Sequence, residues 1–404
     1  MGSEQFRNLS FMLVTHGGYV YGQMEALRDF LSNAGTRHLG YIAHPFQYTP
    51  EKKSIMVLYE NGEVRTFHSP EVRAPQLILY LNDSVLTLLF VLISRRRYSV
   101  YVGADPLNAV LGLLLKSVRI VRHVVFYTLD YVPTRFNSHL LNSAYHAIDR
   151  ICVEHCDYTW NVSQAITTAR GREGVVQVTQ LEVPACTQSY DELKNPEGNF
   201  ERSNIVFIGH LRKGHGLELL LRAFPQVLEK VPSAKLIIIG GGPLEHFLRT
   251  EARDHNMLNS VDFRGYIKDR EEVSRIISRC AFGLAPYEPS AETFTWFADS
   301  GKAKHYISCG LPVIITSVPR FSKEIEMYQA GLVVEYDEEK LADAMVKLLT
   351  DKALLDRMRL NAAELSQKYS WNRVFSRALV DTMKGISDSQ VKTLARRANA
   401  SVQD

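Results

Sequence analysis

Short apolar runs followed by amphipathic stretches fill the first half of the chain. Residues 11–14 form an apolar run, and the glycine pair Gly17 and Gly18 comes shortly after it. A helical period starts near Gln23 and places four apolar side chains on one side: Met24, Leu27, Phe30 and Leu31. This order predicts a strand, a glycine loop and a helix in succession.

The same half holds further elements. Residues 55–67 alternate around Asn61 and Gly62, which predicts a β-hairpin. We expect buried strands at residues 76–81, 122–129 and, less regularly, 98–103, and helices at residues 106–118 and 139–156. Short apolar strands that alternate with helices predict a parallel sheet covered on both faces.

The second half is more regular. Prolines, a glycine and several charges between residues 183 and 203 indicate a linker. Beyond it, helices separate six expected strands, at residues 204–209, 235–241, 261–267, 282–287, 311–316 and 331–336. This pattern predicts a doubly wound α/β domain.

The chain is therefore expected to be α/β, with two Rossmann-like doubly wound domains at residues 1–190 and 191–370 that face each other across a cleft. Residues 371–404 are expected to form a C-terminal helix and tail that packs back toward the N-terminal domain, with Trp371 and Phe375 as anchors. Open α/β sheets bind ligands beyond the carboxyl ends of their strands, so the cleft is the expected ligand site.

Composition adds limits to this architecture. Of the 404 residues, 46% are hydrophobic and 23% charged, as in ordinary globular domains, and a net charge of +3 is too small to favour binding to nucleic acid. Five scattered cysteines favour a reducing cytoplasm over a disulfide framework. Cys152, His155 and Cys156 have the spacing of half a metal site, but no second half follows, so one turn of a helix is favoured and no metal is expected.

The most apolar run, residues 84–93, is followed by Arg95, Arg96 and Arg97. This run is too short to span a bilayer. A buried helix with a basic C-terminal end is favoured over a basic-rimmed face that lies on acidic lipid. The expected localisation is cytoplasmic, and the second interpretation adds peripheral contact with the inner face of the membrane.

Glycines and cations follow the expected strands of the second half. Gly240–Gly242 end an apolar run, and Lys302 stands just inside a helix that Asp299 or Ser300 can cap. A lysine at this position opposes the helix dipole, whereas a pyrophosphate is favoured there by the dipole, the amides and the ammonium together. The alternatives are a tight turn for the glycines and a solvent-facing lysine.

A second basic loop, with His210, Arg212, Lys213 and His215, follows the first strand of this half. Two positive loops at one sheet edge predict a doubly charged anion, against the alternative of a solvated loop. The chain has no dinucleotide fingerprint, no P-loop, no nucleophile elbow and no zinc-protease motif.

Five segments of the second half resemble the donor-binding domain of GT-B-fold glycosyltransferases that use nucleotide sugars, especially the retaining family four. They read VFIGHLRKGHGLELLLRAF, KLIIIGGGPL, VDFRGYI, YISCGLPVIIT and AGLVVEYDEEKLADAM. In the first half, THGGYVYGQMEALRDFL is similar to the acceptor-side glycine loop of that family. The resemblance covers most of the chain and is strong only from residue 204 to residue 375.

The resemblance implies transfer of a sugar, with retention, from a nucleoside-diphosphate sugar to an acceptor hydroxyl, and no required cofactor or metal. It places the base near Gly265, Tyr266 and Ile267, and the nucleotide along Gly241 and Gly242. The implied acceptor is a saccharide, a lipid-linked saccharide or a protein.

Two departures from the family pattern stand out. His210 and His215 replace the arginine and lysine that clamp the phosphates, and Phe297 and His305 replace a pair of glutamates. Some related retaining enzymes instead use K-x-x-x-Y before G-L-P-V. Here that variant matches Lys302 and Tyr306.

Lys302 with Arg212 or Lys213 is expected to stabilise the departing diphosphate. Asp130 or His16 is a candidate to orient the acceptor hydroxyl or the sugar, and a structural role is the alternative for each. The residues expected to bind substrate are Gly17, Gly18, His210, His215, Gly241, Gly242, Gly265, Tyr266, Ile267, Lys302, His305 and Tyr306. The departures also leave open a non-catalytic subunit that binds nucleotide or scaffolds a partner enzyme. A third class is an epimerase or phosphorylase of the same fold.

Overall fold

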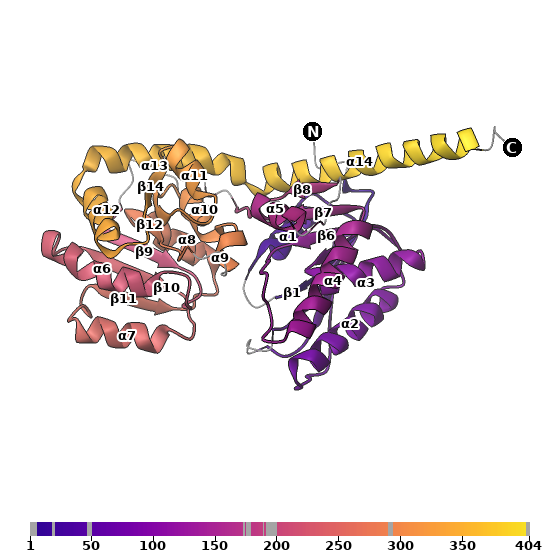
Figure 1. The fold of residues 1–404 in the computed structure, drawn as a ribbon, viewed down its shortest axis with the longest axis horizontal. Helices are drawn as coiled ribbons and strands as arrows, with labels where there is room; N and C mark the ends of the chain where they lie inside the picture. The colour runs from indigo at the N-terminus through magenta and orange to yellow at the C-terminus, as the bar shows by residue number, and fades with distance from the viewer. Residues whose placement is uncertain are drawn as a thin grey trace. The chain divides into compact units, whose positions relative to one another are not determined.

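The computed structural model describes residues 6–17, 21–46, 51–172, 174, 179–188, 190, 200–289 and 294–400. The chain divides into two compact units, drawn in Figure 1. The first unit contains residues 1–184 and 371–404, and the second contains residues 185–370.

The first unit is built on a sheet with the strand order β4-β3-β2-β1-β5-β6-β7-β8. The sheet is parallel from β2 to β8, and the expected hairpin around Asn61 and Gly62 is confirmed as the antiparallel pair β3–β4 at its edge. The strands are β1 (Ser10–His16), β2 (His38–His44), β3 (Ile55–Glu60), β4 (Glu63–His68), β5 (Tyr98–Ala104), β6 (Val121–Thr128), β7 (Tyr158–Asn161) and β8 (Gln180–Glu182).

Helices cover this sheet on both faces (Figure 1). They are α1 (Gln23–Asn33), α2 (Gln76–Ile93), α3 (Pro106–Ser117), α4 (His139–His155), α5 (Gln164–Arg172) and α14 (Trp371–Ala400). Helices α2, α3 and α4 share one hydrophobic core, in which Phe90, Ala109 and Cys152 pack with Met12 and Phe126 of the sheet. Helix α14 lies beside α1, where the ring centroids of Phe30 and Phe375 are 5.7 Å apart.

Helix α2 differs from two sequence expectations. Residues 76–81, expected as a strand, form the first turns of this helix, which continues through the polar residues Asn82 and Asp83 into residues 84–93. The expected burial of the helix holds only for its inner side, which carries Asp83, Thr87, Phe90 and Val91. By length and composition α2 is long and apolar enough to cross a membrane, yet only 22% of it is buried in the protein.

The second unit confirms the expected doubly wound pattern, with a parallel sheet in the order β11-β10-β9-β12-β13-β14. Its strands are β9 (Asn204–Ile208), β10 (Lys235–Ile239), β11 (Val261–Gly265), β12 (Phe282–Ala285), β13 (Val313–Thr316) and β14 (Gly331–Val334). Its helices are α6 (Leu217–Lys230), α7 (Glu245–Asp254), α8 (Arg270–Ser278), α9 (Phe294–Phe297), α10 (Gly301–Ser308), α11 (Ser322–Met327), α12 (Glu338–Thr350) and α13 (Lys352–Ser366), followed by the 3₁₀ turn η3 (Gln367–Tyr369).

Two hydrophobic cores hold the helices of the second unit onto its sheet. Successive residues of β9 point to opposite faces, so Phe207 packs in one core and Ile208 in the other. Because the strands of this sheet are all parallel, the loops that follow them lie along one edge of the sheet.

Candidate active site

Two loops at the carboxyl edge of the second sheet are joined by backbone hydrogen bonds. The loop after β9 and the glycine loop after β10 are linked by Gly209 N–H to Ile239 O (3.0 Å) and Leu211 N–H to Gly241 O (3.0 Å). Leu244 N–H also donates to Leu211 O at 2.9 Å. Main-chain contacts this close leave no room for side chains between the loops.

The glycines of the second loop differ in whether the surrounding atoms leave room for a side chain. A Cβ at Gly240 would lie 1.9 Å from Gly209 O, and a Cβ at Gly242 would lie 2.5 Å from His210 Nδ1. Both residues also have positive φ, so the loop packing itself requires them. A Cβ at Gly241 would meet nothing closer than 3.9 Å. Of the two glycines expected to line the nucleotide, Gly241 therefore faces open space, whereas Gly242 packs against His210.

Lys302 points its ammonium into this edge of the sheet. Helix α10 begins at Gly301, and Ser300 Oγ caps it by accepting from Ala303 N–H at 3.2 Å. The Lys302 Nζ atom is 4.1 Å from the ring centroid of Phe207. It is buried and has no hydrogen-bond partner among the described residues.

The environment of Lys302 disfavours its charge. Burial, with a smaller contribution from repulsion by Arg212, lowers the Lys302 pKa to about 7. Across the described parts of the chain, no carboxylate forms an ion pair with Lys302. Contact with the faces of Phe207 and Tyr287 offsets part of the cost of burying the charge. A buried cation without a counter-ion is unfavourable, so an anion that enters here is held strongly.

The two histidines of the loop do not add positive charge, which corrects the expectation that they strengthen a cationic loop. Burial, together with Lys302 and Arg212, lowers the pKa of His215 to about 2 and also lowers that of His210. The His215 Nδ1 atom lies 2.7 Å from His210 O, and its ring stands edge-on to Tyr287. Positive charge therefore comes from Arg212, Lys302 and the exposed Lys213.

The other polar residues of α10 serve packing. Lys304 is buried and pairs with Asp299. His305 bonds Ser274 of α8 at 2.8 Å and stacks on Tyr190, and burial lowers its pKa to about 3. His305 therefore does not face the Lys302 side of the helix.

Tyr306 is fully buried. Its hydroxyl accepts from Ile208 N–H at 2.8 Å and lies 3.2 Å from Leu284 O, so it ties β9 to β12 beneath Lys302. Phe297, which replaces a family glutamate, is also buried, on α9. Of the K-x-x-x-Y pair, Lys302 lies at the site and Tyr306 supports it from below.

The turn expected to hold the base lies next to the glycine loop. Gly240 N–H donates to Gly265 O at 2.8 Å, and Gly265 has a φ of 68°. The Tyr266 side chain is exposed, whereas Ile267 packs partly into the core beside α8. The Gly265 turn is therefore joined to the glycine loop through Gly240, and binding of the base by Gly265, Tyr266 and Ile267 stays a prediction.

A separate polar cluster lies at the carboxyl edge of the first sheet. His16, at the end of β1, is 2.9 Å from Asp105 through Nδ1 and 3.4 Å from Asp83 through Nε2. Burial opposes its charge, but the two carboxylates outweigh burial and raise the His16 pKa to about 9. His44 beside it bonds Ser54 and Thr87, and burial and His16 lower its pKa to about 3.

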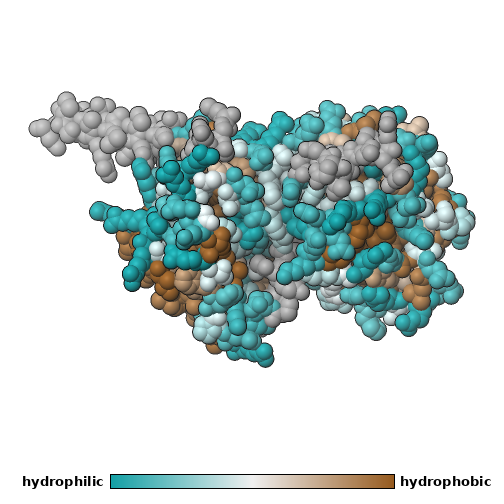
Figure 2. Space-filling model, turned by 180° about the vertical axis from the view of Figure 1, so that it is seen from behind, coloured by the Kyte–Doolittle hydropathy of each residue, from teal (hydrophilic) through white to brown (hydrophobic). Residues whose placement is uncertain are grey.

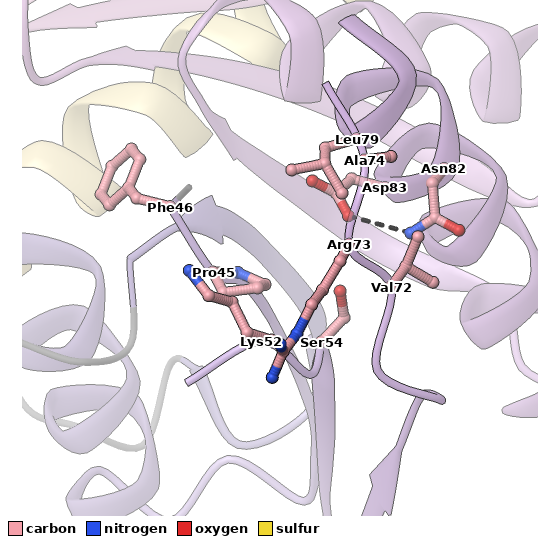
Figure 3. A pocket seen from close by; sticks show the side chains of 10 residues that line it. All are labelled: Pro45, Phe46, Lys52, Ser54, Val72, Arg73, Ala74, Leu79, Asn82 and Asp83. Carbon is pink, nitrogen blue, oxygen red and sulfur yellow. Dashed lines mark hydrogen bonds between the residues drawn. The ribbon is translucent and has the colours of Figure 1, made fainter. Parts of the chain in front are cut away.

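A cavity of about 150 Å³ shares Asp83 with this cluster (Figure 3). Lys52, Arg73 and Asn82 contribute the other charged and amide groups of the lining, and Asn82 donates to Asp83 at 3.4 Å. Sequence reasoning missed Asp83 because its segment was divided between a strand and a helix. The sequence did contain a signal for Asp105, since an aspartate before a proline at a strand end is a typical helix cap.

The other residues expected on the acceptor side lie beside the His16 cluster or away from it. Asp130 is exposed and pairs with Arg135 at 3.0 Å, not with His16. Gly17 N–H donates to His44 O at 2.8 Å, so Gly17 lies beside the cluster, and Gly18 falls outside the described residues. In the portions of the chain that the structure describes, no group of three or more His, Cys, Asp or Glu side chains is placed to hold a metal ion.

Comparison with known proteins agrees with the geometry of the second unit. Residues 202–351 match the family model described as "Glycosyl transferases group 1". The chain is 28% identical over 177 residues to phosphatidyl-myo-inositol mannosyltransferase of Mycobacterium leprae. This alignment covers 43% of this chain and 45% of that protein. It is 27% identical over 172 residues to poly(glycerol-phosphate) alpha-glucosyltransferase of Bacillus subtilis, covering 42% of this chain and 24% of that protein.

The fold likeness extends over nearly the whole chain. Sucrose-phosphate synthase of Thermosynechococcus elongatus superposes with a TM-score of 0.68 and 17% identity, covering 96% of this chain and all of that one. This likeness shows the GT-B fold, with two α/β units in succession. The sequence matches span less than half the length of the curated relatives named above.

Proposed function

We propose that this chain, whose residues 202–351 match the family model of the group 1 glycosyl transferases, transfers a hexosyl group from a nucleoside-diphosphate sugar to an acceptor hydroxyl, with retention. The family match and the mannosyl- and glucosyltransferase relatives support the reaction class. The donor binds at the edge of the second sheet, around Lys302, Arg212 and Gly241.

The observation that carries the proposal is the buried Lys302 ammonium, which has no carboxylate partner among the described residues. A diphosphate supplies the missing negative charge and meets Arg212 at the same loop. The base then lies at the Gly265–Tyr266 turn, one hydrogen bond from the glycine loop. A divalent metal is not part of this proposal, because two cationic side chains can neutralise the diphosphate.

The reaction breaks the bond between the sugar's anomeric carbon and the diphosphate oxygen. The acceptor oxygen bonds to that carbon, and the acceptor's proton leaves with the diphosphate. Negative charge grows on the diphosphate as the bond breaks, and Lys302 and Arg212 already lie where that charge develops. Fixed cations in a water-poor site lower the barrier more than mobile solvent does.

The acceptor is proposed to bind at the His16 cluster of the first unit. His16 keeps its proton at neutral pH, so it orients Asp83 and does not take up a proton itself. Asp83 lines the adjoining cavity and can accept a hydrogen bond from a sugar or inositol hydroxyl. The lipid- and polymer-modifying relatives support a saccharide or lipid-linked saccharide acceptor.

A panel of nucleoside diphosphates and their sugars tests the donor site by thermal shift. Wild type should be stabilised by one member of the panel, and Lys302→Met should lose that shift, because methionine keeps the packing but not the charge. Lys340→Met on the exposed surface of α12 is the matched control and should respond like wild type. An equal shift in Lys302→Met would remove Lys302 from the donor site.

One observation favours a second candidate, a non-catalytic subunit that binds nucleotide. The neutral His210 and His215 leave the phosphate loop with fewer cations than the family pattern provides. Stabilisation by a nucleotide sugar without release of free nucleoside diphosphate, tested over a range of saccharide and glycolipid acceptors, would support this candidate over the transferase.

A further inference from the structure

Helix α2 carries an unusually large apolar surface for a helix of a folded unit. Its outward side chains lie at helical spacing, and Leu81 is the most exposed of them at 69%. Helix α3 packs beside α2 on the same face of the sheet and exposes Leu114 and Val118. We name this surface the α2–α3 face; it consists of Leu77, Ile78, Leu81, Val85, Leu89, Leu92, Ile93, Leu114 and Val118.

The α2–α3 face is continuous enough to require an explanation. Hydrophobic side chains gather at the lower left of Figure 2, where the first unit is drawn. Single exposed leucines are ordinary, whereas a connected apolar patch of this kind marks a surface that binds a protein or a membrane.

The inner side of α2 shows that the helix does not cross a membrane. Phe90 and Val91 pack in the core with the sheet, and Asp83 pairs with His16 and approaches His44 at 3.6 Å. Extraction of α2 into lipid would break this buried cluster and expose the sheet. The helix can therefore meet lipid only along its outward side, as interfacial helices do.

Arginines stand where α2 and α3 end. Arg95, Arg97, Arg119 and Arg122 are exposed, and none of them forms an ion pair with any described residue. Arg97, Arg119 and Arg122 line a shallow hollow of about 500 Å³ together with Lys116. Lys116 itself pairs with Asp157, and Arg96 pairs with Glu60. Free positive charge is therefore concentrated at one end of the apolar surface.

We propose that the α2–α3 face and the arginines at its end dock this protein onto a bilayer that contains anionic lipid. The apolar side chains enter the boundary between headgroups and acyl chains, and the arginine-lined hollow receives acidic headgroups. A second protein would match the apolar side chains but would leave four unpaired arginines without counter-charge. The proposal does not depend on the transferase activity, because docking requires neither donor nor acceptor.

The experiment is co-sedimentation of the full chain with vesicles, without any nucleotide sugar. Wild type should bind vesicles of phosphatidylcholine mixed with phosphatidylglycerol and should bind pure phosphatidylcholine much more weakly. Replacing two central leucines, Leu81→Glu with Leu89→Glu, should lower the vesicle partition coefficient by about tenfold or more. Reversing two arginines, Arg97→Glu with Arg119→Glu, should lower it by about fivefold per site at low salt and less at high salt.

Two matched controls lie in the second unit. Leu360→Glu changes an exposed leucine of α13, and Arg253→Glu changes an exposed arginine of α7, and both variants should bind anionic vesicles like wild type. The thermal unfolding of each variant is measured first, and unchanged unfolding is expected because every altered side chain is exposed.

Three results would overturn the proposal. Wild type could fail to bind anionic vesicles at low salt, or the double leucine variant could bind them as well as wild type does. The third result concerns a second copy of the chain as the occupant. In that case light scattering would show a wild-type dimer without vesicles and a monomer for the leucine variant.

Discussion

The two polar clusters of this protein hold a buried cation in opposite ways. In the second unit Lys302 has no carboxylate partner among the described residues, and its pKa is lowered to about 7. In the first unit His16 lies between Asp83 and Asp105, and its pKa is raised to about 9. The difference is informative: a cation that already has its counter-ions is part of the folded structure, whereas one without them is suited to bind an anionic ligand.

The largest effect expected from this comparison concerns Lys302→Met. Loss of the charge that meets the leaving diphosphate should reduce kcat/KM for sugar transfer by about 10²–10³-fold. The same variant should raise the unfolding free energy of the ligand-free protein by about 1–3 kcal/mol, because a buried unpaired group is removed. Steady-state kinetics and urea unfolding measure the two quantities.

A ligand-free Lys302→Met protein that is less stable than wild type would contradict the contrast between the clusters. It would mean that the ammonium already has a partner in the absence of ligand.

A change of the opposite sign in the unfolding free energy is expected when His16 loses one of its carboxylate partners. In Asp105→Asn the amide keeps the cap on Asn108 N–H but removes a counter-ion of the imidazolium. The unfolding free energy should fall by about 2–3 kcal/mol, and the pKa of His16 should fall below its wild-type value of about 9. Urea unfolding and NMR titration of the imidazole report the two changes.

Asp351→Asn is the control for this substitution, because Asp351 caps α13 in the same way without a histidine partner. An equal loss of stability in the two variants would assign the effect to the helix cap alone.

The pH dependence of stability separates the two clusters again. His16, with a raised pKa, stabilises the folded protein fully below 6.5, and this contribution is lost as the pH rises toward 9. Lys302, with a lowered pKa, destabilises the ligand-free protein below 7, and this penalty is relieved as the pH rises from 7 toward 10.5. The stability of wild type relative to His16→Gln should therefore fall with pH, and that relative to Lys302→Met should rise.

Each slope should reach about 1.4 kcal/mol per pH unit at most, because one proton is involved in each case. Urea unfolding of the three proteins at several pH values between neutral and alkaline gives both slopes. Slopes of the same sign would refute the opposite charge balance of the two clusters.

The smallest effect is expected from Tyr306→Phe. This change leaves Ile208 N–H without its acceptor, so the unfolding free energy should fall by about 1 kcal/mol. The thermal shift produced by the donor nucleotide should stay as in wild type, since Tyr306 lies beneath the site and not in it. Loss of that shift at unchanged stability would instead make Tyr306 a ligand contact.

Sequence reasoning predicted most of the fold and placed Lys302 at the edge of the second sheet, where we propose that the donor binds. The strands of the second unit and Lys302 at the edge of their sheet follow from local patterns: apolar runs, glycine turns and a serine cap. The histidines at positions 210 and 215 show where such reasoning stops. Their residue type permits a positive charge, and only the burial and the nearby cations of the folded loop remove it.

The acceptor-side cluster could not be found in the same way. His16, Asp83 and Asp105 come from three elements far apart in the sequence, and no local signal links them. The error at residues 76–81 made this harder, because it placed the start of α2 in a strand and hid the side of the helix that carries Asp83.

The sequence by itself determined which segments are strands and helices in the second unit, and which residue types end each strand, because periodicity and turn chemistry are local. Tertiary structure alone decided which charges are paired, which histidines are neutral and which side of α2 stays exposed. Those properties depend on burial and on neighbours brought from distant parts of the chain, and neither is written in a local pattern.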